Sequence, residues 1–380
     1  MAGLGALLAA TLGAASRLPA TPPADTWNPK AAVAYLDQRE SWWMAWPVAA
    51  RDHHTFCISC HTAVPYALSR PALRAALGEQ TATPDERELV DDVTKRVRLW
   101  NDVKPFYTDQ GDGTHKSAQS RGTEAVLNAL ILASYDSQSG KLGSDTLLAF
   151  QEMWALQEMT GEGKGAWGWL QFNNEPWEAH DSEYYGAAVA AVAAGEAPDN
   201  YRAAPEIQNN LKLLREYLGR EYPNQSPINH VVLLWASEEL PGLLTRNQQE
   251  AIIDEVVRDQ RADGGWSLAS LCWTRKDWSA MSLVKLWLRS DATPLEPKSD
   301  GYATGLITFA LEKADLPRVD AHLKQGLAWL VRNQNKTEGR WPAYSVNGRR
   351  DPSSGTGHFM SDAATAYAVL ALTENERHRM

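Results

Sequence analysis

The stretch that decides the fold reads Gly326-Leu-Ala-Trp-Leu-Val-Arg-Asn-Gln334, then four further residues, then Gly339-Arg-Trp341. An amphipathic helix ends at the glutamine, whose side-chain amide can bond the backbone of the next turn while the tryptophan packs over the helix pair. The glycine–tryptophan part returns as Gly165-Ala-Trp167 and Gly264-Gly-Trp266, each time after an amphipathic helix. A unit that is repeated in this way predicts helical hairpins tied to their neighbours.

Two kinds of helix alternate along the chain. Five stretches that are small and apolar nearly all round predict buried helices, with serine as the expected N-cap. These stretches begin at Ser120, Ser182, Ser226, Ser299 and Ser361. Amphipathic helices with a charged face are expected between them, over residues 86–101, 144–159, 205–219, 247–260 and 320–334.

A further hairpin is expected from residues 30–44 paired with residues 64–77. Because buried and exposed helices alternate, the buried helices are predicted to form an inner barrel and the amphipathic helices an outer barrel. An open solenoid is the alternative arrangement of such hairpins. The spacing of the glutamine, glycine and tryptophan favours closure, so the predicted fold class is all-α, an (α/α) toroid of five to six helical hairpins.

This pattern resembles the squalene–hopene cyclase and protein prenyltransferase superfamily over about residues 86–380. The resemblance implies an (α/α) toroid with Gln–Trp repeats. Three departures concern activity: the chain has room for one toroidal domain rather than two, the protonating Asp-x-Asp-Asp motif of the cyclases is absent, and the prenyltransferase zinc ligands have no match. Cys272 stands alone and is typical of a core thiol. The resemblance therefore supports the fold and not an activity.

The most specific short motif is Cys57-Ile-Ser-Cys60-His61. Two thiols at this spacing reach the two vinyl groups on one porphyrin edge, and the adjacent histidine then reaches the iron. Over these five residues the chain resembles c-type cytochromes, which implies one covalent haem c with His61 as an iron ligand. A redox dithiol, a zinc half-site and a structural disulfide are the alternatives. Candidates for a second iron ligand are His53, His54, Met44 and Met281, with His115, His180, His230 and His358 as further candidates from the body of the protein. A five-coordinate iron is the other alternative.

Composition and the N-terminus suggest an exported protein. The 380 residues carry a net charge of −10 and no run of Lys or Arg, which argues against nucleic acid as a partner. Residues 1–20 are apolar and small and are typical of a signal peptide, and no later apolar run reaches the roughly 18 residues of a membrane span. We therefore expect a periplasmic protein without a membrane span in the mature chain. Its expected parts are a signal peptide over 1–20, a Trp-rich haem-binding segment over 21–85 and the toroid over 86–380.

A second candidate site lies at one mouth of the predicted barrel. All inner helices of such a ring start at the same end, so the loops before them converge there, together with positive helix ends. Polar groups over an apolar, aromatic-lined cavity form a plausible site, and N-capping or solvated loops are the alternative. The candidates are His115, Arg121, Glu124, His180, Asp181, Glu183, His230, Asp300, His358 and Asp362. A long insertion adds a helical segment over 277–288, expected either to cover this mouth or to pack as one more helix.

Three functions follow from these features and stay open at this point. The first, which we favour, is an exported mono-haem protein that transfers electrons to a redox partner protein, with the toroid as a docking surface. The second is a haem-dependent oxidoreductase or terpenoid-type enzyme that acts on an apolar small molecule in the barrel. The third is a toroidal binding protein whose haem is structural.

Haem attachment is directly measurable. Mature protein expressed with the haem-maturation machinery is expected to show a Soret band and a pyridine haemochrome spectrum, because both thiols form thioether bonds to the porphyrin. Free thiols at both Cys57 and Cys60 in that material, or the absence of a Soret band, would contradict the haem prediction.

Overall fold

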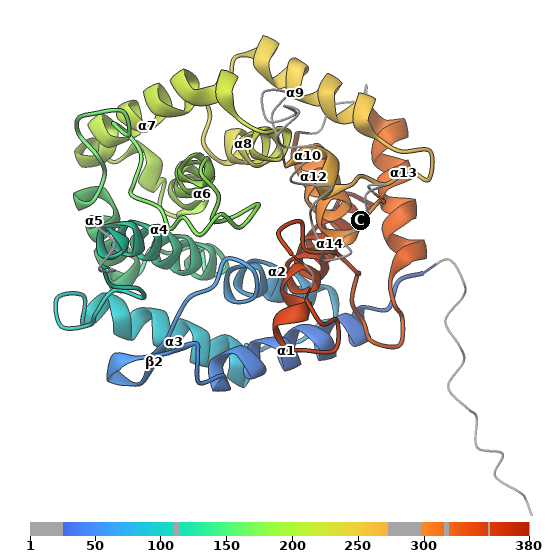
Figure 1. Ribbon diagram of the computed structural model, residues 1–380, viewed down its shortest axis with the longest axis horizontal. Coiled ribbons are helices and arrows are strands. Elements are labelled where there is room, and N and C mark those ends of the chain that lie inside the picture. Colours follow the sequence, from blue (N-terminus) through green and yellow to red (C-terminus); the bar gives the residue numbers. More distant parts are fainter. Residues whose placement is uncertain (1–25, 110–114, 273–297, 315–318, 349, 380) are drawn as a thin grey trace, which may run out of the picture.

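The computed structural model describes residues 26–109, 115–272, 298–314, 319–348 and 350–379. Within these residues the long helices form two concentric rings (Figure 1). The inner ring consists of α2 (Ala63–Ala76), α4 (Lys116–Ser137), α6 (Ser182–Glu196), α8 (Pro227–Glu239), α12 (Gly301–Ala314) and α14 (Phe359–Arg379). The outer ring consists of α1 (Pro29–Ala45), α3 (Pro84–Arg98), α5 (Ser144–Ala155), α7 (Gln208–Glu221), α9 (Arg246–Asp259) and α13 (Asp320–Asn333).

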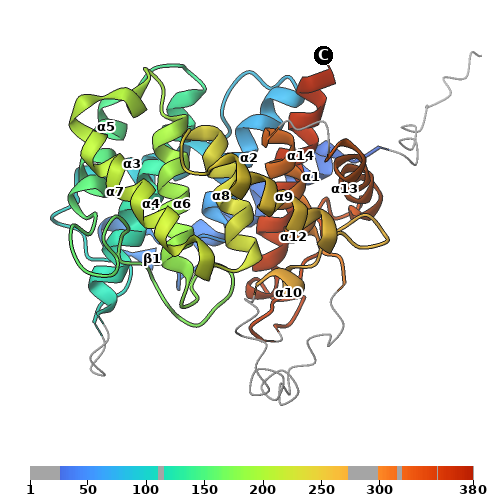
Figure 2. The same ribbon diagram turned by 90° about the horizontal axis from the view of Figure 1, so that it is seen from above.

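The inner helices contact one another in chain order, and α14 returns to contact α2, so the ring is closed. Outer and inner helices alternate along the chain, and α5, α7, α9 and α13 contact chiefly the inner helix that precedes each of them. The inner helices therefore run in the same direction and stand side by side in the view of Figure 2. Short elements lie in the connections. The hairpin of β1 (Ala50–Arg51) and β2 (Thr55–Phe56) precedes α2, α10 (Leu268–Leu271) follows α9, and 3₁₀ turns precede α7, α8 and α14.

The sequence of each helix explains which ring it joins. Every residue of α6 from 184 to 194 is buried, because alanine, valine and tyrosine cover all its faces. Helix α3 instead buries one stripe that contains Leu89, Val93 and Val97, and it starts with a capping box between Thr83 and Glu86. Helices with one apolar stripe suit the outer ring, where the opposite face is solvated.

The glutamine–tryptophan repeat makes the predicted ties. The Gln334 side-chain amide donates to the carbonyl of Gly339, 3.1 Å away, and to that of Asn28, 3.0 Å away. The Trp341 indole donates to the carbonyl of Leu330 at 2.7 Å. Gly339 has a φ of +83°, a left-handed conformation that glycine adopts without strain. This repeat therefore joins the end of α13 to the start of α1.

The same construction recurs at the two other repeats. The Gln157 amide donates to the carbonyls of Gly165 and Asn210, and the Trp167 indole donates to that of Met153. At the third repeat the corresponding bonds join Gln260 with Gly264 and His322, and Trp266 with Val256. Each glutamine thus ties the end of one outer helix to the first turns of the next outer helix.

A buried ion pair also holds the first and last helices together. Asp362 on α14 is 2% exposed and accepts from Arg39 on α1 through both carboxylate oxygens, at 2.8 and 2.9 Å. The hydroxyl of Tyr35, one turn earlier on α1, donates to the same carboxylate at 2.7 Å. Figure 1 shows α1 beside the C-terminal helices, where the ring closes.

The predicted fold class is confirmed, and residues 30–44 and 64–77 form the sixth hairpin as α1 and α2. Of the five serines expected as N-caps, only Ser226 occupies that position, and its side chain makes no capping bond. Ser182 is the first residue of α6 and Ser299 precedes α12 by two residues, while Ser120 and Ser361 lie inside α4 and α14. Their hydroxyls accept instead from the backbone N–H groups of Tyr107 and Ala343. These serines therefore satisfy loop backbone that the ring would otherwise bury without a partner.

Two expectations lie outside the described residues: the signal peptide over 1–20 and the extra helical segment over 277–288. Among the helices of the described part of the chain, none has the length and apolar character that crossing a membrane requires.

Ring closure predicts a large cost for breaking the Arg39–Asp362 pair. Arg39→Met is expected to lower the free energy of unfolding by about 3–5 kcal/mol, because it leaves the Asp362 carboxylate buried without its cation. The control is Arg98→Met, which removes an equally bidentate pair with Asp145 from an exposed position and is expected to cost less than about 1 kcal/mol. Urea unfolding followed by circular dichroism measures both, and equal losses would contradict the role given to Asp362.

Candidate functional site

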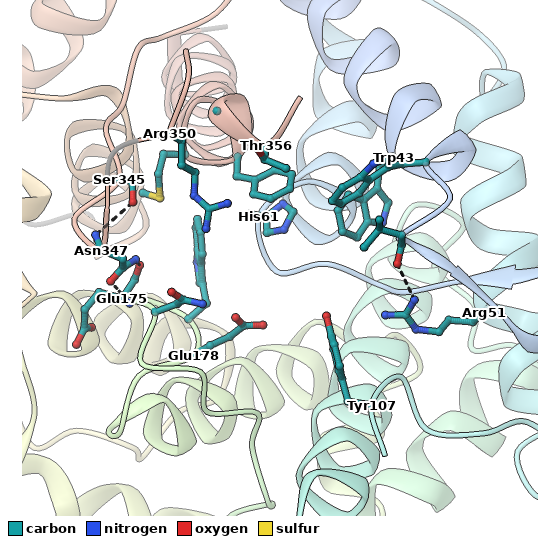
Figure 3. A pocket seen from close by; sticks show the side chains of 17 residues that line it. Trp43, Arg51, His61, Tyr107, Glu175, Glu178, Ser345, Asn347, Arg350 and Thr356 are labelled. Carbon is teal, nitrogen blue, oxygen red and sulfur yellow. Dashed lines mark hydrogen bonds between the residues drawn. The ribbon is translucent and has the colours of Figure 1, made fainter. Parts of the chain in front are cut away.

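A cavity of about 200 Å³ lies at the mouth where the inner helices begin (Figure 3). Four connections supply its walls: those that precede α2, α4, α6 and α14. The aromatic part of the lining consists of Trp43, Trp46, Tyr107, Trp177 and Phe359. The polar part consists of Arg51, His61, Asn174, Glu175, Glu178, Ser345, Asn347, Arg350 and Thr356.

His61 is held in this wall by packing and by one hydrogen bond. Its imidazole stacks on Phe359 with 3.7 Å between ring centroids and meets Trp43 edge-on at 4.9 Å. Its Nδ1 lies 2.8 Å from the hydroxyl of Thr62. Burial lowers the pKa of His61 well below its usual value, and the charges of Arg350 and Arg39 lower it further. The imidazole is therefore neutral at neutral pH.

Glu178 supplies a carboxyl group to the same cavity, and Figure 3 shows it directed toward the centre. Its position is fixed by a tight loop in which the backbone of Glu178 and Asn174 exchange hydrogen bonds at 2.8 and 3.2 Å. Burial raises the pKa of Glu178, while Asn174, Lys116 and Arg350 partly offset the increase. The carboxyl group is thus biased toward its protonated form beside a neutral imidazole.

Two arginines and a loop tie complete the lining. The Arg350 guanidinium lies 5.5 Å from the Phe359 ring centroid. Arg51 donates to the carbonyl of Val48 at 2.8 Å and lies 5.2 Å from the Tyr107 ring, so it links the loop before α2 to the loop before α4. The Asn347 amide exchanges two hydrogen bonds with the backbone of residue 175, at 2.6 and 2.7 Å. This exchange joins the loop before α6 to the loop before α14 across the cavity.

Of the residues selected from the sequence, only His61 lines the cavity. Asp362 does not line the cavity; its carboxylate accepts a hydrogen bond of 2.8 Å from the hydroxyl of Thr62, the residue that follows His61. His180 and Asp181 lie at the same mouth and form a cluster with Glu175, in which the possible ligand atoms lie within 4.8 Å of one another. Among the described residues this is the cluster whose donors suit a divalent cation.

The other mouth candidates have structural roles or lie apart from the cavity. Glu124 pairs with Arg96 at 2.5 Å in a fully buried site, with Arg121 at 3.5 Å. His230 uses both ring nitrogens, toward Glu255 and the carbonyl of residue 222. Four further candidates are placed as follows: Asp300 caps the start of α12, Glu183 lies on α6 outside the cavity, His115 is exposed before α4, and His358 bonds the Tyr35 hydroxyl.

None of the described candidates for a second iron ligand lines the cavity. His53 and His54 are exposed in the short 3₁₀ turn between β1 and β2, and Met44 packs against the core. Met281 lies outside the described residues. Met360, which the sequence did not suggest, is the methionine in the cavity wall.

The residues of the haem motif fit a haem only in part. Cys57 and Cys60 are free, buried and adjacent to His61, and burial raises the pKa of Cys57 to about 12. Neither thiol lines the cavity, and Phe359 covers one face of the His61 imidazole. The volume is also below the roughly 300–1,000 Å³ of typical ligand pockets. The two thiols and the imidazole match a haem-attachment motif, whereas the cavity beside them does not offer the space for a haem. Covalent haem therefore stays a prediction of the sequence.

Sequence reasoning missed Glu178, although it identified the loop that carries this residue. The signal used was position just before an inner helix, which selected His180 and Asp181 two and three residues later. Nothing in the local sequence distinguishes Glu178, because the residues that share its cavity, such as Arg350 and Tyr107, come from distant loops.

Comparison with known proteins shows a likeness of fold only. No family model and no curated protein matches this chain. A solved structure described as a possible member of the GH105 family from Klebsiella pneumoniae is similar over 93% of this chain and 93% of its own, with 13% identity and a TM-score of 0.51. A wild-type glycosidase is similar over 90% of this chain and 98% of its own, with 12% identity and a TM-score of 0.48. The first likeness shows a shared (α/α)-toroid fold.

These findings correct the functional interpretation made from the sequence. The solved structure that shares the fold is described as a possible member of the GH105 family, and its description names neither haem nor electron transfer. The favoured function, an exported electron-transfer protein, is therefore withdrawn together with its haem-based alternatives. The cavity carries Arg51, Glu178 and Arg350 beside its aromatic lining, and an apolar small molecule as partner stays a prediction of the sequence.

Proposed function

We propose that this protein hydrolyses a glycosidic bond in the mouth cavity, with Glu178 as general acid and His61 as general base. The observation that carries the proposal is the opposite pKa perturbation of these two side chains in one cavity: raised for the carboxyl group and lowered for the imidazole. Groups whose environments push their pKa values apart in this way are suited to complementary acid and base roles. The fold shared with a possible GH105 member supports the reaction class.

The proposed reaction is a single displacement by water. His61 accepts a proton from the water, whose oxygen forms a bond to the anomeric carbon. The bond from that carbon to the leaving oxygen breaks, and the leaving oxygen takes the proton of Glu178. Solvent returns the proton from His61 to Glu178. The reaction needs the carboxyl group protonated, so activity is expected to fall as the pH rises through its raised pKa.

The cavity wall is consistent with a sugar. Sugars present apolar ring faces and many hydroxyl groups, and this wall offers Trp46 and Trp177 beside the polar groups of Tyr107, Asn347 and Arg350. The volume of about 200 Å³ suits one sugar ring rather than a chain. We therefore infer that the terminal residue of a glycoside binds there.

We also propose a common origin with the squalene–hopene cyclase and prenyltransferase toroids. The three glutamine–tryptophan ties that join neighbouring outer helices support this origin. Covalent haem on Cys57 and Cys60 is the competing proposal for the Cys57–His61 motif, because an iron bound to His61 would take the ring nitrogen that a general base needs. The spectrum described above distinguishes the two. Export to the periplasm likewise stays a prediction of the first 20 residues.

Glu178→Gln tests the acid. Wild-type protein is expected to hydrolyse at least one member of a panel of aryl and alkyl glycosides, and the variant to lose about 10²–10⁴-fold in kcat/KM on alkyl glycosides, whose leaving oxygen needs a proton. The loss is expected to be much smaller on the dinitrophenyl glycoside of the same sugar, because that group leaves without protonation. Product release followed by absorbance and chromatography measures both.

The matched control is Glu152→Gln. Glu152 is a half-buried glutamate whose pKa burial raises to about 8, and it lies on α5 away from the cavity. This variant is expected to keep wild-type rates on both kinds of glycoside. Equal losses on alkyl and dinitrophenyl substrates in Glu178→Gln, or wild-type protein inactive on the whole panel, would overturn the proposed function.

A further inference from the structure

A chain of hydrogen bonds runs from the cavity to the ring closure behind it. The Nδ1 of His61 lies 2.8 Å from the Thr62 hydroxyl, and that hydroxyl donates to the Asp362 carboxylate at 2.8 Å. Neither Thr62 nor Asp362 lines the cavity. Both are buried, at 3% and 2% exposure, so these bonds are shielded from water.

The donors around Asp362 determine where the protons lie. Its Oδ1 accepts from the Tyr35 hydroxyl and the Arg39 Nε, and its Oδ2 accepts from the Arg39 Nη2 and the Thr62 hydroxyl. Burial raises the pKa of Asp362, and the ion pair with Arg39 opposes that effect. An ionised carboxylate has about four acceptor positions, so these four donors saturate it.

A proton count then sets the tautomer of His61. A threonine hydroxyl has one proton, and Thr62 gives that proton to Asp362. The Thr62 oxygen can therefore only accept from the imidazole, which requires the proton to be on Nδ1. In the neutral ring the lone pair is then on Nε2, the nitrogen that remains for the cavity.

We propose that Thr62 and Asp362 are positioning residues that hold His61 as the Nδ1–H tautomer with its Nε2 lone pair available to the cavity. The use of that lone pair by a general base rests on the proposed function. The assignment of the tautomer rests on the hydrogen bonds alone. Free histidine prefers the proton on Nε2, so the tautomer itself reports whether the chain of bonds exists.

The direct test is the tautomer of His61, measured by long-range ¹H–¹⁵N correlation on histidine-labelled full-length protein and assigned with His61→Gln. The wild-type spectrum is expected to show a protonated Nδ1 and an unprotonated Nε2. Thr62→Val removes the acceptor and is expected to move the proton to Nε2. Thr62→Ser keeps the hydroxyl and is expected to keep the wild-type pattern, which separates loss of the bond from loss of packing.

Kinetics give a second readout on whichever glycoside the protein hydrolyses. Thr62→Val is expected to lower kcat by about 10²-fold with little change in KM, and Thr62→Ser to restore most of the rate. A protonated Nε2 in the wild-type protein, or an unchanged tautomer in Thr62→Val, would overturn the positioning role. An Nδ1–H tautomer in a protein that hydrolyses no glycoside would overturn the proposed function and leave the positioning role standing.

Discussion

The structure depends on the ion pair and the hydrogen bonds that stabilise the negative charge of one buried carboxylate, Asp362. A charge with 2% exposure is stable only when it is paired and hydrogen-bonded. The partners come from two other places in the chain: Tyr35 and Arg39 on the first outer helix, and Thr62 in the loop before the first inner helix. The interaction that closes the ring therefore also fixes the side chain next to His61, and the cavity exists only in the closed ring.

Most of the fold could be predicted because its determinants are local and repeated. A glutamine at a helix end, a glycine that turns the chain and a tryptophan two residues later recur three times, and each copy makes the same bonds. The local sequence also distinguishes a helix that is apolar on all faces, such as α6, from a helix with a single apolar stripe, such as α3. Serine misled at Ser120 and Ser361, because a hydroxyl that caps a helix and one that binds a loop have the same local sequence.

The candidate site was predicted only in outline, because a cavity is a property of loops that meet. The rule that all inner helices start at one mouth identified the loops that form the cavity. Within those loops, residue type alone then selected side chains that do not line it. His230 looks free in sequence, yet both its nitrogens are bonded, whereas Glu178 gains its raised pKa from burial beside distant residues. The motif at Cys57–His61 predicted an iron ligand from the spacing of the two thiols and the histidine that follows them, and in the structure that histidine lines the cavity.

The central claim is that water, deprotonated by His61, attacks the anomeric carbon in one step while Glu178 protonates the leaving oxygen. The most direct test is the configuration of the first-formed sugar, observed by ¹H NMR before mutarotation during hydrolysis of a substrate from the glycoside panel. A single displacement inverts the anomeric centre, so the account predicts the inverted anomer. The retained anomer, which requires a covalent intermediate on a carboxylate, would contradict it.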